Sequence, residues 1–441
     1  MATASDSSDI ERALERRRAA VAAQWDGRDE VVLIGAGDLI LRPGRDDSAY
    51  RFETHSEYFY LTDRNYPGGV LAFDPADGWT DFTAPVTVED RLWSGATDTG
   101  SDGPTTDDLP AWLEARSSRR VAWLGSPPAG ALLDTVTAAD VDTELAQDLR
   151  FGLAAVRRSK DAIELARMRV ANDATSAGFH AALPLLRDGV SEREVQIELE
   201  AEAFRHGSEA MAYDTIIGGG VNSAVLHFAP SSRRLRAGEL VLIDAGAQYL
   251  GYASDVTRTY PVGGSLSSIQ QEIHAVVHRA EQAAIEHCRP GVEWRDVHLV
   301  AALSIAEGLA AIGLLKGDPA TLVESGATWL FFPHGIGHLV GLGVRDAGGV
   351  PLRERRGEPK PYPNLRINLP LEPGFVVTVE PGVYFVPAIL GDPESRGRYR
   401  DAVDWGRVDQ LLGFGGVRIE DDVLITVDGY EVMTGDVPML G

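Results

Sequence analysis

Short apolar runs that end in a carboxylate are the most informative hydrophobic pattern in this chain. Residues 241–246 read Val-Leu-Ile-Asp-Ala-Gly, residues 375–380 read Phe-Val-Val-Thr-Val-Glu, and residues 417–425 carry Glu420 inside a third such run. Continuous apolar runs of this length are typical of strands that are buried on both faces. Because a buried carboxylate is costly without a positive partner, the three runs together predict a shared cation site.

The first run and residues 252–260, separated by glycines at positions 246 and 251, predict a hairpin of two strands. Asp244 and Asp255 would face each other across this hairpin. Two like charges at that separation cannot both stay ionised without a cation between them. For either aspartate alone, a turn cap or a solvated position is the better explanation. The recurrence of the pattern at Glu380 and Glu420 is what favours a metal site.

A glycine-rich segment, residues 333–338, supplies the imidazoles His334 and His338 between the aspartates and the glutamates. Carboxylate and imidazole ligands suit manganese, cobalt, iron or zinc, and the scarcity of thiolates argues against a closed structural zinc site. A carboxylate-rich set of this size would support two bridged divalent ions about 3.5–4 Å apart.

Other hydrophobic periodicities predict an N-terminal α/β domain with a mixed sheet, followed by a boundary near residues 149–159. The second part should contain two helix-helix-hairpin halves, each delivering two carboxylates, and this order indicates a pseudo-two-fold. Ser191 and Glu194 have the spacing of a helix capping box. The predicted N-terminal elements are a helix from Asp9 to about Trp25 and strands at residues 31–34, 57–62, 69–74, 79–83 and 121–124, and the later helices lie at about 268–288 and 294–312.

Composition narrows the class of partner. The chain has 441 residues, which favours two domains, and a net charge of −25, which argues against nucleic acid or an anionic membrane as a partner. The single cysteine excludes an internal disulfide. The N-terminus lacks the pattern of a signal peptide, and no apolar run is long enough to span a bilayer. We therefore expect a cytoplasmic protein.

These motifs, in this order, resemble the pita-bread metallopeptidases, and within them the proline-specific branch of prolidase (Xaa-Pro dipeptidase) and aminopeptidase P. The resemblance is strong over residues 155–438 and weak before them. It implies a two-domain α/β protein. Residues 1–154 would form a creatinase-like α/β domain that serves assembly, and residues 155–441 a pita-bread α+β catalytic domain. It also implies a homodimer.

The resemblance assigns roles to the acidic residues. Asp244 would bind one metal ion, Asp255 and Glu420 would bridge both ions, and His338 and Glu380 would complete the second. It implies two divalent ions, with manganese first and cobalt, iron or zinc as alternatives. A hydroxide held between the ions would attack the peptide bond. Glu380 would act both as ligand and as general base.

Further residues are assigned by the same resemblance. His227 would have a proton-shuttle and substrate role, and His334 would line the substrate pocket, although a lone histidine such as His227 is otherwise typical of a satisfied core or surface position. The family usually has a His-Asp pair where this chain has Arg345 and Asp346. Because arginine cannot shuttle a proton, Arg345 would only donate hydrogen bonds to substrate. A weakly active or binding-only relative is therefore an alternative.

Two arginines bear on the substrate. An arginine fork suits the free carboxylate of a dipeptide, and Arg366, fourteen positions before Glu380 in the segment 360–366, resembles the prolidase pattern, with surface solvation as the alternative. Arg418 is a second anion-binding candidate. We therefore predict first a prolidase that hydrolyses Xaa-Pro dipeptides, and as the alternative an aminopeptidase P that acts on longer peptides with proline at the second position.

Overall fold

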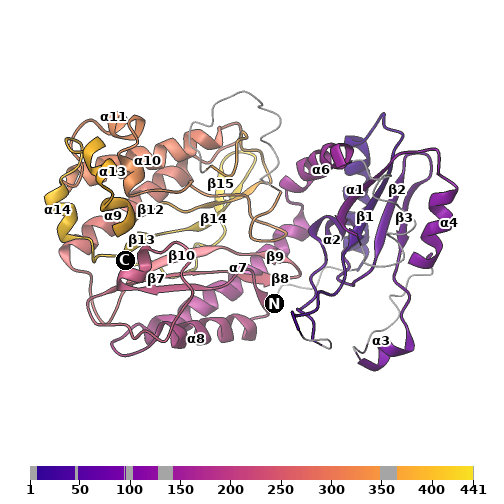
Figure 1. Ribbon diagram of the computed structural model, residues 1–441, viewed down its shortest axis with the longest axis horizontal. Helices are drawn as coiled ribbons and strands as arrows, with labels where there is room; N and C mark the ends of the chain where they lie inside the picture. Colours follow the sequence, from indigo (N-terminus) through magenta and orange to yellow (C-terminus); the bar gives the residue numbers. More distant parts are fainter. Residues whose placement is uncertain are drawn as a thin grey trace. The chain divides into compact units, whose positions relative to one another are not determined.

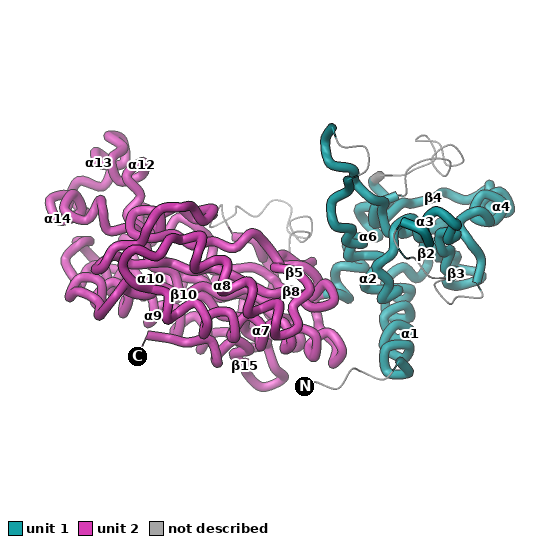
Figure 2. Tube along the Cα trace, turned by 90° about the horizontal axis from the view of Figure 1, so that it is seen from below, with its two compact units in different colours: residues 1, 3–157 teal, residues 2, 158–441 magenta. Residues whose placement is uncertain are grey.

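The chain divides into two compact units in its computed structural model, one of residues 3–157 and one of residues 158–441 (Figure 2). The structure describes residues 7–44, 48–93, 95, 103–127, 143–347 and 365–440. The predicted segment 360–364 before Arg366 lies outside these residues. Among the described helices, none combines the length and the apolar character needed to cross a bilayer.

The first unit is an α/β unit built on a four-stranded sheet of order β3-β2-β1-β4 (Figure 1). Strand β1 pairs parallel with β4 and antiparallel with β2, so the sheet is mixed, as predicted. Buried aliphatic and aromatic side chains such as Leu33 and Phe82 form its core. Its elements are α1 (Ser7–Gln24), β1 (Val31–Ala36), α2 (Ser56–Thr62), β2 (Val70–Asp74), β3 (Gly78–Phe82), α3 (Val88–Trp93), η1 (Thr106–Asp108), α4 (Leu109–Glu114), β4 (Val121–Ser126) and α6 (Thr143–Arg158).

The prediction of a strand at residues 57–62 is wrong, because these residues form helix α2. The ring of His55 accepts a hydrogen bond from the Glu57 amide at the start of the helix. All residues from Glu57 to Thr62 are buried. A short apolar run that is buried on every side has no hydrophobic periodicity, so its sequence cannot distinguish a strand from a helix.

The second unit contains two pairs of long helices, and its strands lie between them (Figure 1). Asp161 and Glu164 form a capping box at the first helix of one pair, and the predicted capping box of Ser191 and Glu194 is confirmed at the second. The positions predicted for the other pair are also confirmed. The helices are α7 (Ala162–Ala182) with α8 (Glu192–Arg205), and α9 (Ser268–His287) with α10 (Trp294–Ala311).

All described strand pairs of this unit are antiparallel, in sheets of order β10-β7-β6, β11-β14-β15, β5-β8-β9 and β12-β13. The strands are β5 (Ala210–Met211), β6 (Ile216–Gly219), β7 (Leu240–Ala245), β8 (Ala247–Tyr249), β9 (Tyr252–Ala253), β10 (Val256–Pro261), β11 (Val376–Val379), β12 (Gly382–Tyr384), β13 (Gly416–Arg418), β14 (Asp421–Ile425) and β15 (Tyr430–Val432). Shorter helices are η2 (Leu183–Leu185), η3 (Gly220–Ala224), α11 (Pro319–Glu324), η4 (Thr328–Leu330), α12 (Pro387–Leu390), α13 (Pro393–Arg398) and α14 (Trp405–Gln410).

The aspartate hairpin differs from the simple form that was predicted. Strands β7 and β10 do pair, but the register places Asp244 opposite Thr257 rather than opposite Asp255. Asp255 lies just before β10, because the chain between the two strands leaves their sheet and pairs as β8 and β9 with β5. The two aspartates are nevertheless close in space, through a third residue described below.

Candidate active site

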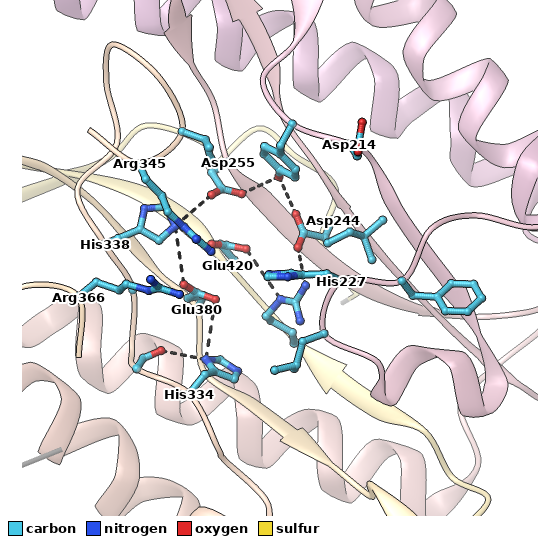
Figure 3. Close-up of a pocket in the computed structure, with 18 of the residues that line it drawn as sticks. Asp214, His227, Asp244, Asp255, His334, His338, Arg345, Arg366, Glu380 and Glu420 are labelled. Atoms are coloured by element: carbon cyan, nitrogen blue, oxygen red, sulfur yellow. Dashed lines mark hydrogen bonds and ion pairs between the residues drawn. The ribbon is translucent and has the colours of Figure 1, made fainter. Parts of the chain in front are cut away.

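A cavity of about 900 Å³ in the second unit collects the side chains that the sequence singled out. It is lined by all five residues expected to bind metal, and by His227, His334, Arg345, Arg366 and Arg418. Figure 3 shows the carboxylates of Asp244, Asp255, Glu380 and Glu420 arranged around one space, with His338 beside Asp255. Side chains separated by up to 176 positions, from Asp244 to Glu420, therefore meet at one place.

Asp255, His338 and Glu420 form the most compact part of this group. One ligand atom from each lies within 4.8 Å of the others, and all three residues are buried. The Nε2 atom of His338 lies 3.5 Å from a carboxylate oxygen of Asp255 and 4.0 Å from one of Glu380. The Nδ1 atom lies 3.1 Å from the carbonyl oxygen of Leu339. A carbonyl only accepts, so Nδ1 carries the proton of the neutral ring.

The neutral state of His338 leaves an unprotonated Nε2 facing acidic oxygens. Burial lowers the pKa of His338 to about 4. The lone pair of Nε2 is then directed at the Asp255 carboxylate, and two acceptors at that separation are stable only with a positive ion or a proton between them. Metal ligation requires a neutral histidine, and the other nitrogen of a ligating ring commonly donates to a carboxylate, a backbone carbonyl or water. The residues present therefore fit a divalent cation.

The raised pKa values of the acids that line the cavity also favour a bound cation. Burial, together with the neighbouring Asp244 and Asp422, raises the pKa of Asp255 well above its usual value. Burial and the neighbouring Asp255 do the same to the pKa of Glu420. Burial also raises the pKa of Glu380 to about 7. Bound divalent cations would lower these raised pKa values, because they favour the ionised carboxylates that the protein environment alone disfavours.

Hydrogen bonds hold three of the four acids, namely Asp244, Asp255 and Glu420. The hydroxyl of Tyr213 lies 2.6 Å from an oxygen of Asp244 and 2.6 Å from one of Asp255, so one phenol joins the two aspartates. The Oγ1 of Thr257 donates to Glu420 at 2.6 Å. The backbone amide of Asp255 donates to the buried Asp422 at 3.1 Å. These partners orient the carboxylates toward the cavity centre.

Arg418 lines the cavity, but its side chain is almost completely buried beside the carboxylates. It is 3% exposed, and its guanidinium donates to Asp244, to the hydroxyl of Tyr384 at 3.0 Å and to Thr257 at 3.1 Å. The Tyr384 hydroxyl in turn lies 2.9 Å from Nε2 of His334. Burial and the charge of Arg418 lower the pKa of His334 to about 3, so this ring is neutral and accepts from Tyr384.

Three further basic residues line the cavity with exposed side chains. Arg345 and Arg366 lie on the side of His338 and Glu380 (Figure 3). Their positive charges add to the effect of burial in lowering the pKa of His338, and they partly oppose the rise that burial causes in the pKa of Glu380. His227 reaches the cavity from the segment that follows β6. Asp346, next to Arg345, forms a buried ion pair with Lys160 at 2.9 Å, which anchors the backbone beside Arg345.

Comparison with known proteins identifies the family. Residues 166–427 match the profile of Metallopeptidase family M24, and residues 14–104 match that of the Aminopeptidase P, N-terminal domain. The chain belongs to metallopeptidase family M24. The N-terminal match is carried by the first unit and the M24 match by the unit that holds the cavity. The two-domain α/β architecture with a pita-bread second domain, predicted from sequence, is confirmed.

M24 relatives cover nearly the whole chain. A probable Xaa-Pro aminopeptidase of Botryotinia fuckeliana is 32% identical over an alignment of 398 residues that covers 88% of this chain and 86% of that protein. Proline aminopeptidase P II from Yersinia pestis is 29% identical, with a TM-score of 0.80 over 98% of this chain and 97% of that one. Aminopeptidase P from E. coli with the inhibitor Pro-Leu is 28% identical, with a TM-score of 0.79 over 97% and 96%.

These relatives change the order of the two sequence-based hypotheses. The prolidase interpretation came first, mainly because of Arg366, but the M24 relatives carry the name Xaa-Pro aminopeptidase. The alternative interpretation, aminopeptidase P, is therefore the better supported. A single arginine beside the cavity was too small a signal to separate the two branches, because the resemblance assigned the acidic and histidine motifs to both.

Sequence reasoning missed two tyrosines. Tyr213 joins Asp244 and Asp255, and Tyr384 joins His334 to Arg418. Tyr384 ends strand β12, four positions after Glu380, and the even spacing along an extended segment was an available signal. Tyr213 precedes β6 without any pattern that marks it.

Proposed function

We propose that this M24 protein is a metal-dependent Xaa-Pro aminopeptidase, which removes the N-terminal residue from peptides with proline at the second position. The observation that carries the proposal is the convergence of four carboxylates and a neutral histidine in one cavity of about 900 Å³. The names and coverage of the relatives support the substrate class. The acidic cluster suits a positively charged peptide N-terminus as well as metal.

In this proposal the protein binds two divalent ions, for which manganese is our first choice. They would be held by Asp244, Asp255, His338, Glu380 and Glu420. Bound divalent metal supplies Lewis acidity, which polarises a carbonyl and lowers the pKa of a water molecule. The chain's own residues then handle protons and charge. Glu380, whose carboxylate lines the cavity beside His338, would accept and return a proton. The remaining carboxylates balance the cation charge.

The basic residues would orient the peptide. Arg345 can donate hydrogen bonds to a substrate carbonyl but keeps its proton, because a guanidinium does not deprotonate in this pH range. His227 is exposed at the cavity and would contact the substrate or pass a proton. His334 stays neutral and is held by Tyr384, so it would shape the pocket wall rather than carry charge.

The test is a paired assay of Ala-Pro-Ala and Ala-Pro with a defined manganese concentration. We expect cleavage of the tripeptide at the Ala-Pro bond and weaker cleavage of the dipeptide. Glu380→Ala should abolish turnover, whereas Glu372→Ala, at an exposed position outside the cavity, should not. A metal-loaded enzyme that leaves the tripeptide intact would contradict the proposal.

Arg366 keeps prolidase as the second candidate. Its exposed guanidinium lines the cavity and suits the carboxylate of a dipeptide. If the guanidinium of Arg366 binds that carboxylate, Arg366→Ala should raise the KM for Ala-Pro far more than the KM for Ala-Pro-Ala. Equal effects on both substrates would show that Arg366 does not recognise the free carboxylate.

The homodimer implied by the family resemblance is also part of the proposal. Its support is helix α3, where Val88, Leu92 and Trp93 are 83%, 75% and 79% exposed. Large apolar side chains gathered on one short helix are typical of an interaction surface, and a second copy is the partner that we propose. Light scattering during gel filtration should give twice the mass of 47.5 kDa. A monomer at micromolar concentration would contradict this part.

A further inference from the structure

Glu192, outside the cavity, has a fully buried carboxylate with every hydrogen bond directed at one segment. It is the first residue of α8 and is 0% exposed. Its Oε1 accepts from the Gly219 amide at 3.0 Å and from the Asn222 side chain at 2.8 Å. Its Oε2 accepts from the amide and the hydroxyl of Ser231, at 3.1 and 2.6 Å. Both oxygens of this acid are therefore occupied.

The two oxygens hold opposite ends of the segment that carries His227. Gly219 and Asn222 lie before this residue and Ser231 lies after it. The backbone strengthens the second end, because the amide of Glu192 donates to the Arg233 carbonyl at 3.1 Å and that of Arg193 donates to the Ser231 carbonyl at 3.0 Å. One side chain thus closes a loop of about a dozen residues at its base.

The other face of the segment is held by the strand that delivers Arg418. The hydroxyl of Ser223 accepts from the Gly416 amide at 2.8 Å and donates to the Gly220 carbonyl at 2.6 Å. Between the two anchors the apex is open: Val225 is 51% exposed, and residues 226–229 line the cavity. The position of the His227 ring therefore depends on the anchors at the base of the loop.

We propose that Glu192 is a positioning residue for His227, which sets the place of that ring in the cavity without touching the substrate. The inference rests on the proposed function, because the consequence of the position is read out as peptidase activity. A carboxylate is required because all four groups that face it are donors. An amide in its place presents a donor to one end of the loop and leaves that end without an acceptor.

The experiment compares Glu192→Gln, His227→Ala and the double variant in steady-state cleavage of Ala-Pro-Ala with saturating manganese. Glu198→Gln is the control, on the same helix with a side chain that is 43% exposed. A small displacement of a catalytic group lowers the rate steeply, so we expect kcat/KM to fall about 10- to 100-fold in Glu192→Gln. The double variant should be no slower than His227→Ala, with bound manganese unchanged. Additive losses, or an unchanged rate in Glu192→Gln, would overturn the inference.

Hydrogen exchange separates this inference from the proposed function. In Glu192→Gln the amides of residues 219–231 should exchange faster than in the wild type, while those of β7 and β10 keep their rates. Should Glu192→Gln fail to fold, Ser231→Ala removes only one of the four hydrogen bonds and should increase exchange in the same residues. Unchanged exchange contradicts the role of Glu192. A wild-type protein without Xaa-Pro cleavage contradicts the proposed function instead.

Discussion

At the scale of single residues, the phenol of Tyr213 connects two aspartates that the pairing of their strands does not place opposite each other. The register of β7 and β10 leaves Asp244 and Asp255 out of direct opposition, and Tyr213 closes the gap with one hydroxyl 2.6 Å from each. Burial and the two carboxylates raise the pKa of Tyr213 well above its usual value, so the hydroxyl keeps its proton. The hydroxyl therefore lies between two acids that would bind metal, donating to one while it contacts the other.

Tyr213→Phe should therefore weaken metal binding. Loss of a group that orients metal ligands typically costs about 10- to 100-fold in metal affinity. Titration of the metal-free protein with manganese, followed by calorimetry, measures the change. Tyr249→Phe, on β8 and outside the cavity lining, is the control and should bind as the wild type does. Equal affinities for wild type and Tyr213→Phe would show that the phenol does not orient the ligands.

Arg345 makes a second residue-scale prediction, on the pH dependence of catalysis. The wild-type side chain stays charged at every accessible pH, whereas a histidine at that place titrates with an ordinary pKa of about 6.5. We expect the plot of kcat/KM against pH to gain an ionisation near that value in Arg345→His. Arg234→His, at a side chain that is 69% exposed and outside the cavity lining, should keep the wild-type profile. If the plot of kcat/KM against pH is the same in Arg345→His as in the wild type, Arg345 takes no part in the reaction.

Most residues expected to bind metal could be found from the sequence because they have a local signal. Asp244, Glu380 and Glu420 end or interrupt apolar runs, and His338 lies in a glycine-rich segment. The supporting residues have no such signal. Tyr213 is 31 positions from Asp244, and Glu192 is 39 positions from Ser231. Their roles arise only when the fold brings together segments whose separate patterns are unremarkable.

At the scale of elements, predictions held where periodicity or capping was clear and failed where burial was complete. The buried side chains of α9 and α10 recur every three or four residues, and α8 begins at its capping box. Helix α2 has every residue from Glu57 to Thr62 buried, so no polar face remained to show a period. The sequence did not predict that the chain between β7 and β10 forms β8 and β9 in another sheet, because glycines at 246 and 251 are also what a simple hairpin would contain.

Helix α10 makes the element-scale prediction. It buries His298 beside Phe332, and burial lowers the pKa of His298 to about 4. In the unfolded chain this histidine has a pKa near 6.5. Between these values the unfolded state binds more protons, so folding stability is complete above pH 6.5 and declines as the pH falls toward 4. The decline from this one ring approaches about 3 kcal/mol.

Urea unfolding of the metal-free protein at pH 7.0 and 4.5 measures this loss. His298→Phe retains an aromatic ring against Phe332 but cannot take up a proton. We expect its free energy of unfolding to fall less between the two pH values than that of the wild type. His287→Phe, at the end of α9, is the control, because its side chain is not buried. A pH dependence that is the same in wild type and His298→Phe would contradict the assignment.

At the scale of the whole molecule, the cavity joins the two halves of the second unit. Asp244 and Asp255 come from the first half, and His338, Glu380 and Glu420 come from the second. Without a cation, burial and the neighbouring acids raise the pKa of Asp255 and of Glu420, so it is costly to ionise these carboxyls at the junction. Metal bound there would therefore stabilise the packing of one half against the other.

Removal of metal should accordingly lower the melting temperature of the second unit. Ligand at about 100 times its Kd stabilises the folded state by about 2.7 kcal/mol, and for a unit of this size each kcal/mol corresponds to about 2–4 °C. Scanning calorimetry of the wild type with EDTA and with excess manganese should therefore show a shift of about 5–10 °C in the melting temperature.

The variant Asp255→Asn keeps the shape of the side chain but removes one of the buried acids. Its metal-free form should melt no lower than the metal-free wild type, because one carboxyl fewer has to be protonated on folding, yet manganese should shift it little. The same manganese shift in both proteins would show that the ion does not bind at the junction of the two halves.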